Sequence, residues 1–339
     1  MKKKSILFIT RKYPPKIGGM ETFSYNFYKF FKINNEIKIE LITGNIFKIF
    51  FLIFYFKFIL RKKFDFIHLG DGAIIGLSLF FKSKISITIH GLDLIYKRFF
   101  YQTYFNFFIK NIDTFICVSQ NTKRILESKK IKNKIIVIPN SINTNNQSSV
   151  GKSEKKFKNK NLKILLVGRQ IKRKGTLWFL KKVVPKLPKD IDLLIIGNGV
   201  EKEKIKAEIS HLKYHKIKYL ENCSNQKLIR YYIDSDLFLM PNIKVNNDIE
   251  GFGIVLLEAS LYNNILIGSN IDGIPSAIIN NKNGHLCEVK DYNDFIDKIM
   301  LYYNNRTLLK KNKKKFSKYT KENFNNDFIF KKYLTEVFK

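Results

Sequence analysis

The chain has 339 residues, which is too long for one ordinary hydrophobic core and fits two domains of usual size. Hydrophobic residues make up 45% and charged residues 27%, which is typical of a globular protein. The 62 Lys and Arg against 28 Asp and Glu give a net charge of +34, which favours nucleic acid, anionic lipid or phosphorylated substrates as partners. An A/T-rich genome would supply the same Lys, Ile, Asn and Phe without selection, so both explanations stay open.

The three cysteines are far apart and form no Cys-x-x-Cys pair, which argues against a disulfide framework and against a zinc site. At the N-terminus, the apolar run Ile6–Ile9 is followed at once by charged residues and prolines, so no signal peptide is visible. We therefore expect a protein of the reducing cytoplasm.

Short β-rich apolar runs alternate with helical stretches along the first 150 residues, a pattern typical of a parallel α/β sheet. The predicted strands are Ser5–Thr10, Ile37–Thr43, Phe64–Leu69, Ile85–His90, Thr114–Ser119 and Ile135–Pro139. The predicted helices are Glu21–Ile33, Ile46–Lys62, Leu94–Asn111 and Asn121–Lys130. The polar stretch Asn140–Lys160 then predicts a linker.

One segment, Ile46–Leu60, is almost wholly apolar and is followed by three basic residues. Its fifteen residues fall short of the roughly 20 that a spanning helix needs. Lys48 and Lys57 would point to opposite helix faces at ~100° per residue, which leaves no clean polar face. A helix covered by its own domain and a helix that touches lipid are therefore both possible here.

The same alternation resumes after the linker, so the chain consists of two similar halves. The predicted strands are Leu162–Val167, Ile191–Ile196, Ile217–Leu220, Asp236–Met240 and Ile265–Gly268. The predicted helices are Thr176–Lys186, Glu201–Leu212, Gln226–Tyr232, Ile254–Leu261 and Asp291–Tyr303, with a basic, aromatic and helical end over Asn304–Lys339. We expect domains at 1–150 and 151–320, with a helical tail at 321–339.

Two motifs of the first half follow predicted strands. Gly18 and Gly19 enter a helix, where backbone N–H groups can approach a phosphate, although glycine pairs often only form turns. His90 ends the fourth strand before Gly91, a position from which it can hydrogen-bond a ligand or serve the structure alone. No Ser or Cys lies in a nucleophile elbow, which excludes a triad hydrolase of that type.

In the second half, Gly168 and Arg169 follow a strand, with Lys174 five residues further on. Two cations before a helix suit a diphosphate, since Arg169 can bind it bidentately and Lys174 as a point charge. The next strand ends in the tight turn Gly197-Asn198-Gly199.

The sharpest feature is the run from Glu250 through Phe252, Gly253 and Ile254 to Glu258, in which two carboxylates bracket residues that are apolar or glycine. An acid such as Glu258 is rarely tolerated in a buried helix without a partner. Glu250 lies in the glycine loop at the N-terminus of that helix, beside exposed N–H groups.

Together these pieces resemble the family-four glycosyltransferases, which have the GT-B fold of two facing Rossmann-like domains with the active site in the cleft between them. The matching elements, in order, are Gly18-Gly19, His90-Gly91, Pro139-Asn140, Gly168-Arg169 with Lys174-Gly175, Gly197-Asn198-Gly199, and Glu250 through Glu258. They extend over nearly the whole chain, and the Glu-x7-Glu stretch is the most specific of them.

The resemblance implies a role for each residue. Arg169 and Lys174 would neutralise the donor's diphosphate. Glu258 would hold the ribose hydroxyls and Glu250 the hydroxyls of the transferred sugar, while His90 would lie near the sugar and the reaction centre. The remaining residues would bind the donor. These are Gly18, Gly19, Gly168, Gly197, Asn198, Gly199, Phe252, Gly253 and Ile254.

The function implied is retaining transfer of a sugar from a nucleotide-sugar donor, without a metal or other cofactor. The nucleotide would be UDP, the commonest choice in the family. The first domain would hold the acceptor, a glycan or lipid-linked glycan of a bacterial envelope polysaccharide such as lipopolysaccharide or capsule. The apolar and basic stretches Ile46–Lys63 and Phe99–Phe108 suggest a peripheral position on the inner face of the cytoplasmic membrane. The alternatives are a GT-B nucleotide-sugar epimerase and a basic nucleic-acid-binding protein, although no nucleic-acid-binding motif is recognised.

Overall fold

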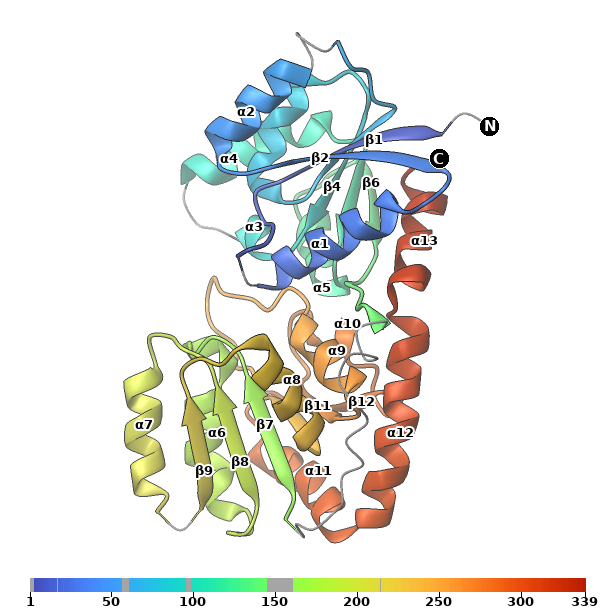
Figure 1. Ribbon diagram of the computed structural model, residues 1–339. Coiled ribbons are helices and arrows are strands. Elements are labelled where there is room, and N and C mark those ends of the chain that lie inside the picture. Colours follow the sequence, from blue (N-terminus) through green and yellow to red (C-terminus); the bar gives the residue numbers. More distant parts are fainter. Residues whose placement is uncertain (1–2, 17, 57–60, 96–98, 145–160, 214) are drawn as a thin grey trace. The chain divides into compact units, whose positions relative to one another are not determined.

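A computed structural model describes residues 3–16, 18–56, 61–95, 99–144, 161–213 and 215–339 (Figure 1). The chain forms two compact units. Unit 1 consists of Met1–Asn143, Glu250–Phe252 and Phe324–Lys339, and unit 2 consists of Thr144–Ile249 and Gly253–Asn323. Most of the predicted linker, residues 145–160, lies outside the described residues. Each unit contains a six-stranded parallel sheet, which confirms the predicted α/β class.

Unit 1 is built on strands in the order β2-β1-β3-β4-β5-β6. Their bounds are β1 (Lys4–Thr10), β2 (Ile37–Thr43), β3 (Phe66–Leu69), β4 (Lys84–Ile89), β5 (Thr114–Cys117) and β6 (Lys134–Val137). Successive side chains of a strand point to opposite faces, so Ile6 and Phe8 enter one core while Leu7 and Ile9 enter another. Because both faces of β1 are covered, this strand has a continuous apolar run from Ile6 to Ile9.

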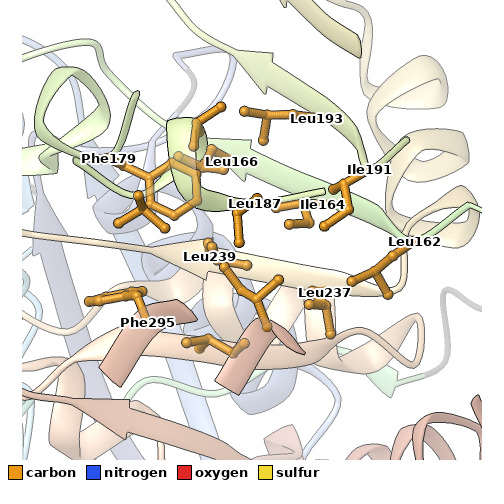
Figure 2. Close-up of a cluster of buried hydrophobic side chains, with 14 of the residues drawn as sticks. Leu162, Ile164, Leu166, Phe179, Leu187, Ile191, Leu193, Leu237, Leu239 and Phe295 are labelled. Atoms are coloured by element: carbon orange, nitrogen blue, oxygen red, sulfur yellow. The ribbon is translucent and has the colours of Figure 1, made fainter. Parts of the chain in front are cut away.

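Unit 2 is built on strands in the order β12-β11-β10-β7-β8-β9. Their bounds are β7 (Lys163–Val167), β8 (Asp192–Ile196), β9 (Lys216–Leu220), β10 (Leu237–Met240), β11 (Ile265–Ser269) and β12 (Gly284–Cys287). Figure 2 shows the core on one face of this sheet, where Leu166, Leu193 and Leu239 from three strands meet Phe179 and Phe295 from the covering helices.

Helices cover both sheets. In unit 1 they are α1 (Gly19–Lys32), α2 (Ile46–Phe54), η2 (Gly72–Phe80), α3 (Leu92–Ile95), α4 (Phe99–Phe108), η3 (Ile109–Asn111), α5 (Gln120–Glu127) and α13 (Asn326–Glu336). In unit 2 they are η5 (Lys172–Lys174), α6 (Thr176–Lys182), η6 (Val184–Lys186), α7 (Lys202–His211), α8 (Asn225–Asp234), α9 (Ile254–Leu261), α10 (Ile274–Ala277), α11 (Tyr292–Asn304) and α12 (Arg306–Asn323). None of the described helices is long and apolar enough to cross a membrane.

Four of the described elements were not predicted from the sequence, and one of them is the 3-10 turn η5. Strand β12 has only two apolar side chains and no β-branched residue, and it forms because it pairs with β11 at the edge of the sheet. The apolar run η2 is a 3-10 helix whose first turn is capped by the buried Asp71, which accepts from the Ala73 N–H. The fourth is the single turn α10, which starts at Ile274.

The predicted helix Ile46–Lys62 is too long at its C-terminal end, because α2 ends at Phe54 and residues 61–65 are not helical. Residues 57–60 of that prediction lie outside the described residues. Helix α2 buries Ile49 and Ile53 against the sheet, whereas Phe47 and Phe51 are 81% and 67% exposed. The predicted helix Leu94–Asn111 contains α4, η3 and part of α3, and residues 96–98 are likewise not described.

The C-terminal helix α13 completes the core of unit 1, where it packs against α1 (Figure 1). Phe330 and Tyr333 of α13 are fully buried. The Tyr333 hydroxyl lies 3.5 Å from Thr88 Oγ1, which in turn lies 3.1 Å from Nε2 of the buried His68. Burial lowers the pKa of His68 to about 3, so the ring is neutral and the network carries no charge at neutral pH.

Candidate functional site

In both sheets the strand order reverses once, between β1 and β3 in unit 1 and between β7 and β10 in unit 2. Ligands of open α/β sheets bind at such reversals, beyond the carboxyl ends of the strands. The residues that follow these strands are therefore the first place to look for a site in each unit.

In unit 2 the loops after β7 and β8 are packed backbone to backbone. Gly197 has φ +139°, and a Cβ there would collide with the Gly168 carbonyl oxygen, so only glycine fits. The buried Gln170 joins the two loops, because its Nε2 donates to the Gly168 carbonyl at 2.9 Å and its N–H to the Asn198 carbonyl at 2.9 Å. Gly199 lies against the Gln170 backbone in the same way. The predicted Gly168 and Gly197–Gly199 motifs thus form one surface.

The cation pair of the sequence analysis lies at the same strand ends. Lys174 ends the 3-10 turn η5, and its Nζ would lie 3.6 Å from a Cβ placed on Gly168. Arg169 is exposed in the turn directly after Gly168. A small cavity of about 10 Å³ at the ends of β7 and β10 is lined by Gly168, Lys174 and Pro241, among others. An ammonium group beside glycine backbone at a strand reversal is an arrangement that suits a phosphate.

Helix α9 reaches the same edge of unit 2. Its N-cap Gly253 has φ +86°, and a Cβ there would come within 3.2 Å of Met240 at the end of β10, so Ile254 starts the helix over that strand. Glu258, one turn further on, accepts a hydrogen bond from the buried Tyr232 hydroxyl of α8 at 3.2 Å. Burial raises the pKa of Glu258, although that hydrogen bond acts in the opposite direction.

In unit 1 His90 directly follows β4, which ends at Ile89, one residue earlier than predicted. Its Nε2 lies 3.1 Å from the Gly70 carbonyl oxygen, which can only accept, so Nε2 carries the proton. Burial lowers the pKa of His90 to about 4, so the ring is neutral at pH 7 and Nδ1 keeps a lone pair. The neutral ring can therefore accept a hydrogen bond from a ligand hydroxyl.

A charged cluster that the sequence analysis missed joins the strand ends around His90. The Arg11 Nη2 donates to Oδ1 of the fully buried Asp71 at 2.7 Å, which links the end of β1 to the loop after β3. Asp93 accepts from the His90 N–H at 3.0 Å. Burial, with a smaller contribution from Asp71, raises the pKa of Asp93 to about 6. The only sequence signal was that Arg11 directly follows a strand and that Asp71 follows one after a single glycine.

The remaining predicted residues of unit 1 lie on two segments. Gly18 is the N-cap residue of α1 and Gly19 its first residue, so both stand at the positive end of the helix. The short segment from Glu250 to Phe252 packs with unit 1, where a Cβ on Gly251 would collide with the His90 carbonyl oxygen.

The structure thus gathers the predicted residues into two groups, one in each unit. Unit 2 holds Gly168, Arg169, Lys174, Gly197, Asn198, Gly199, Gly253, Ile254 and Glu258, and unit 1 holds Gly18, Gly19, His90, Glu250 and Phe252. The roles assigned to these residues, and their meeting in a cleft, stay predictions.

Comparison with known proteins follows this division of the chain. The family model of the glycosyl transferases group 1 matches residues 150–323, slightly more than half of the chain. The model of glycosyltransferase family 4 matches residues 17–146. The chain is 29% identical over 248 residues to the uncharacterized glycosyltransferase MJ1178 of Methanocaldococcus jannaschii, which covers 70% of this chain and 65% of MJ1178. It is 27% identical to an uncharacterized 41.2 kDa protein in the cps region of Klebsiella pneumoniae, over 70% of this chain and 68% of that protein.

Solved structures share the whole architecture. Sucrose-phosphate synthase of Thermosynechococcus elongatus superposes with a TM-score of 0.78 at 16% identity, covering 99% of each chain. Anabaena HepE, solved with UDP and glucose, gives 0.72 at 14% identity over 98% of this chain and 99% of its own. The lipopolysaccharide outer core galactosyltransferase WaaB gives 0.69 at 21% identity, over 98% and 99%.

The fold is therefore the GT-B fold of glycosyltransferases, as predicted. The chain belongs to the glycosyl transferases group 1 family, and with its family-four N-terminal half it is a glycosyltransferase.

Proposed function

We propose that this enzyme transfers a sugar, with retention of configuration, from a UDP-linked donor to a glycan or lipid-linked glycan of a bacterial envelope polysaccharide. The observation that carries the proposal is the glycine and lysine surface at the β7/β10 reversal, formed by Gly168, Lys174 and Gly197. The UDP bound to HepE supports the choice of nucleotide. The cps-region relative and WaaB support the polysaccharide context. The family match favours transfer over the epimerase and nucleic-acid alternatives.

The proposed chemistry is electrostatic. When the bond between the anomeric carbon and the diphosphate oxygen breaks, the electron pair leaves with the diphosphate, whose negative charge increases. Lys174, Arg169 and the N-terminus of α9 would stabilise this charge. These groups would take the place of a metal ion, and no carboxylate nucleophile of the glycosidase type is required.

The acceptor side of the reaction is assigned to unit 1. The neutral His90 ring would accept a hydrogen bond from a sugar hydroxyl through Nδ1, and Glu250 would bind hydroxyls of the transferred sugar. The pair of Arg11 with Asp71 and the Asp93 carboxylate would hold the strand ends on which His90 stands.

A donor panel tests the proposal directly. UDP-, GDP-, ADP- and dTDP-sugars would be compared by thermal shift and by donor hydrolysis. We expect one UDP-sugar to stabilise the protein and to be hydrolysed slowly without acceptor. Stabilisation by a GDP- or ADP-sugar alone would contradict the UDP assignment, and no response to any member would contradict the donor site.

Replacing Glu258 should weaken donor binding, because the ribose hydroxyls lose a carboxylate acceptor. We expect Glu258→Ala to cost on the order of 1.5–3 kcal/mol, which is about 10- to 150-fold in Kd, measured by calorimetry with UDP. Tyr232→Phe is the matched control, because it removes the other partner of the Tyr232–Glu258 hydrogen bond and leaves the carboxylate. If Tyr232→Phe weakened binding as much as Glu258→Ala, the carboxylate would act only through the packing of α8 and α9.

We also propose that the enzyme works in the cytoplasm, peripherally on an anionic bilayer surface. Phe47 and Phe51 of α2 and Phe107 of α4 are 81%, 67% and 61% exposed. The Tyr104 hydroxyl of α4 donates to the Ala73 carbonyl of η2 at 3.2 Å, so α4 and η2 belong to one surface region. No Asp or Glu occurs in residues 44–64, 72–92 or 94–112, whereas Lys and Arg recur there. Aromatic side chains beside cations suit a negatively charged bilayer.

Flotation with liposomes tests this surface. Wild type should float with vesicles containing phosphatidylglycerol at physiological salt, because each basic residue near the surface contributes about 1 kcal/mol. The Arg61/Lys62/Lys63→Ser variant should bind at least tenfold more weakly. Binding that is absent at physiological salt, or equal on neutral vesicles, would contradict the electrostatic account and leave the transfer proposal untouched.

A further inference from the structure

A cavity of about 620 Å³ opens in unit 1 away from the strand ends described above. It lies where β3 and β4 begin, since Phe64 and Asp65 precede β3, and Lys82 and Ser83 precede β4. Gly70 and His90 follow the other ends of these two strands. At ~3.3 Å per residue the four residues of β3 and the six of β4 separate the two edges by roughly 13–20 Å. The cavity is therefore distinct from the candidate acceptor site.

The walls of this cavity are apolar. They include Ile53, Phe56, Phe64, Ile67, Phe80 and Phe81. Ile53 and Ile67 are buried core residues, so the cavity reaches the hydrophobic core of the unit. Its volume falls in the range of small-molecule sites, roughly 300–1,000 Å³.

The rim of the cavity is basic. Arg61, Lys62, Lys63 and Lys82 all line it and are exposed. Lys62 pairs with Glu40 at 2.8 Å, whereas Arg61, Lys63 and Lys82 form no ion pair with a carboxylate within the described part of the chain. The one acidic residue of the lining, Asp65, accepts from the N–H and the hydroxyl of Ser5, both at 2.7 Å. The rim therefore offers three cations to an anionic ligand.

The cavity adjoins the exposed aromatic residues of α2. The ring of Phe50 on α2 contacts that of Phe80 in the cavity wall, with centroids 5.6 Å apart. Phe54, one helical turn after Phe50, is 54% exposed. An apolar cavity with a cationic rim, next to exposed aromatic side chains, is complementary to an amphiphile that has a fatty chain and an anionic head.

We propose that this cavity takes one acyl chain of an anionic phospholipid, whose phosphate is bound by Arg61, Lys63 and Lys82. The lipid would serve as an anchor and not as the acceptor, because its head would lie at the opposite strand ends from His90. The inference rests on the proposed association with a bilayer and goes beyond it by naming a lipid-binding site with a stoichiometry of one.

Monomeric lipid separates this site from a flat docking surface. The full chain would be titrated calorimetrically with dihexanoyl-phosphatidylglycerol below its critical micelle concentration. We expect saturable one-to-one binding, at least tenfold weaker for the phosphatidylcholine analogue. Geranylgeranyl phosphate serves as a second probe, and tighter binding of it than of phosphatidylglycerol would assign the cavity to a prenyl chain and overturn the proposal.

Two variants and one control complete the test. Ser83→Trp should fill the cavity and abolish monomer binding, and the surface variant Arg61/Lys63/Lys82→Ser should reduce phosphatidylglycerol binding to the phosphatidylcholine level. Phe47→Ser, on the exposed side of α2, should weaken vesicle flotation but leave monomer binding unchanged. No saturable binding by wild type, or full binding by the serine variant, overturns the proposal. Donor hydrolysis, measured on the same proteins, reports separately on the proposed transfer reaction.

Discussion

Lys174→Ala should lower kcat for sugar transfer about 10²- to 10³-fold while changing the KM for the donor much less. The charge on the leaving diphosphate is greatest in the transition state, so a cation that contacts it acts mainly on kcat. The position of Lys174 Nζ beside Gly168, where the strand order reverses, is the structural basis for this expectation. Arg169→Ala should act in the same direction, since its side chain is exposed in the adjoining turn. Steady-state kinetics with the donor identified by the panel provides the measurement.

Lys172→Ala is the matched control, because it removes an exposed cation from the same 3-10 turn. Its kcat should stay within about twofold of wild type, which would separate a specific contact from the general positive charge of the chain. Lys174→Arg should restore part of the activity. Full activity in excess EDTA is expected if these cations replace a metal. Unchanged kcat in both alanine variants, or a strict requirement for Mn²⁺ or Mg²⁺, would contradict the electrostatic mechanism.

Phe330→Ala in α13 should destabilise unit 1 by about 3–5 kcal/mol, the usual cost of removing a fully buried phenylalanine. The ring contacts Phe27 of α1 with centroids 5.6 Å apart, so its loss leaves a cavity between α13 and α1. Equilibrium unfolding in urea, followed by circular dichroism, would measure the change.

Phe328→Ala is the control on the same helix, because that ring is 44% exposed and lies under Lys332 Nζ at 4.9 Å. It should cost less than about 1 kcal/mol, since an exposed cation–π contact contributes roughly 0.5–1 kcal/mol. Equal losses in the two variants would mean that α13 stabilises the protein through helix propensity and not through its buried face.

The sequence alone determined the alternation of strands and helices. The runs Ile6–Ile9 in β1 and Leu237–Met240 in β10 are wholly apolar and are buried within parallel sheets, and a short continuous apolar run of this kind favours a buried strand. It also predicted α9 with the bounds that the structure shows, because the glycine loop ends at Gly253 and a mainly apolar run begins at Ile254. These are local properties, set by backbone freedom and by the period of the apolar side chains.

Only the tertiary structure decided which distant residues meet. The contacts of Arg11 with Asp71 and of Gly197 with Gly168 follow from the order of the strands, which brings together loops that no local pattern connects. Strand β12 forms because it pairs with β11 at the edge of the sheet. Helix α13 belongs to unit 1 because its buried face packs into the core around Phe27. The residues of a short or amphipathic segment determine that it can pack against another element. Which element it packs against is decided by packing across the whole unit.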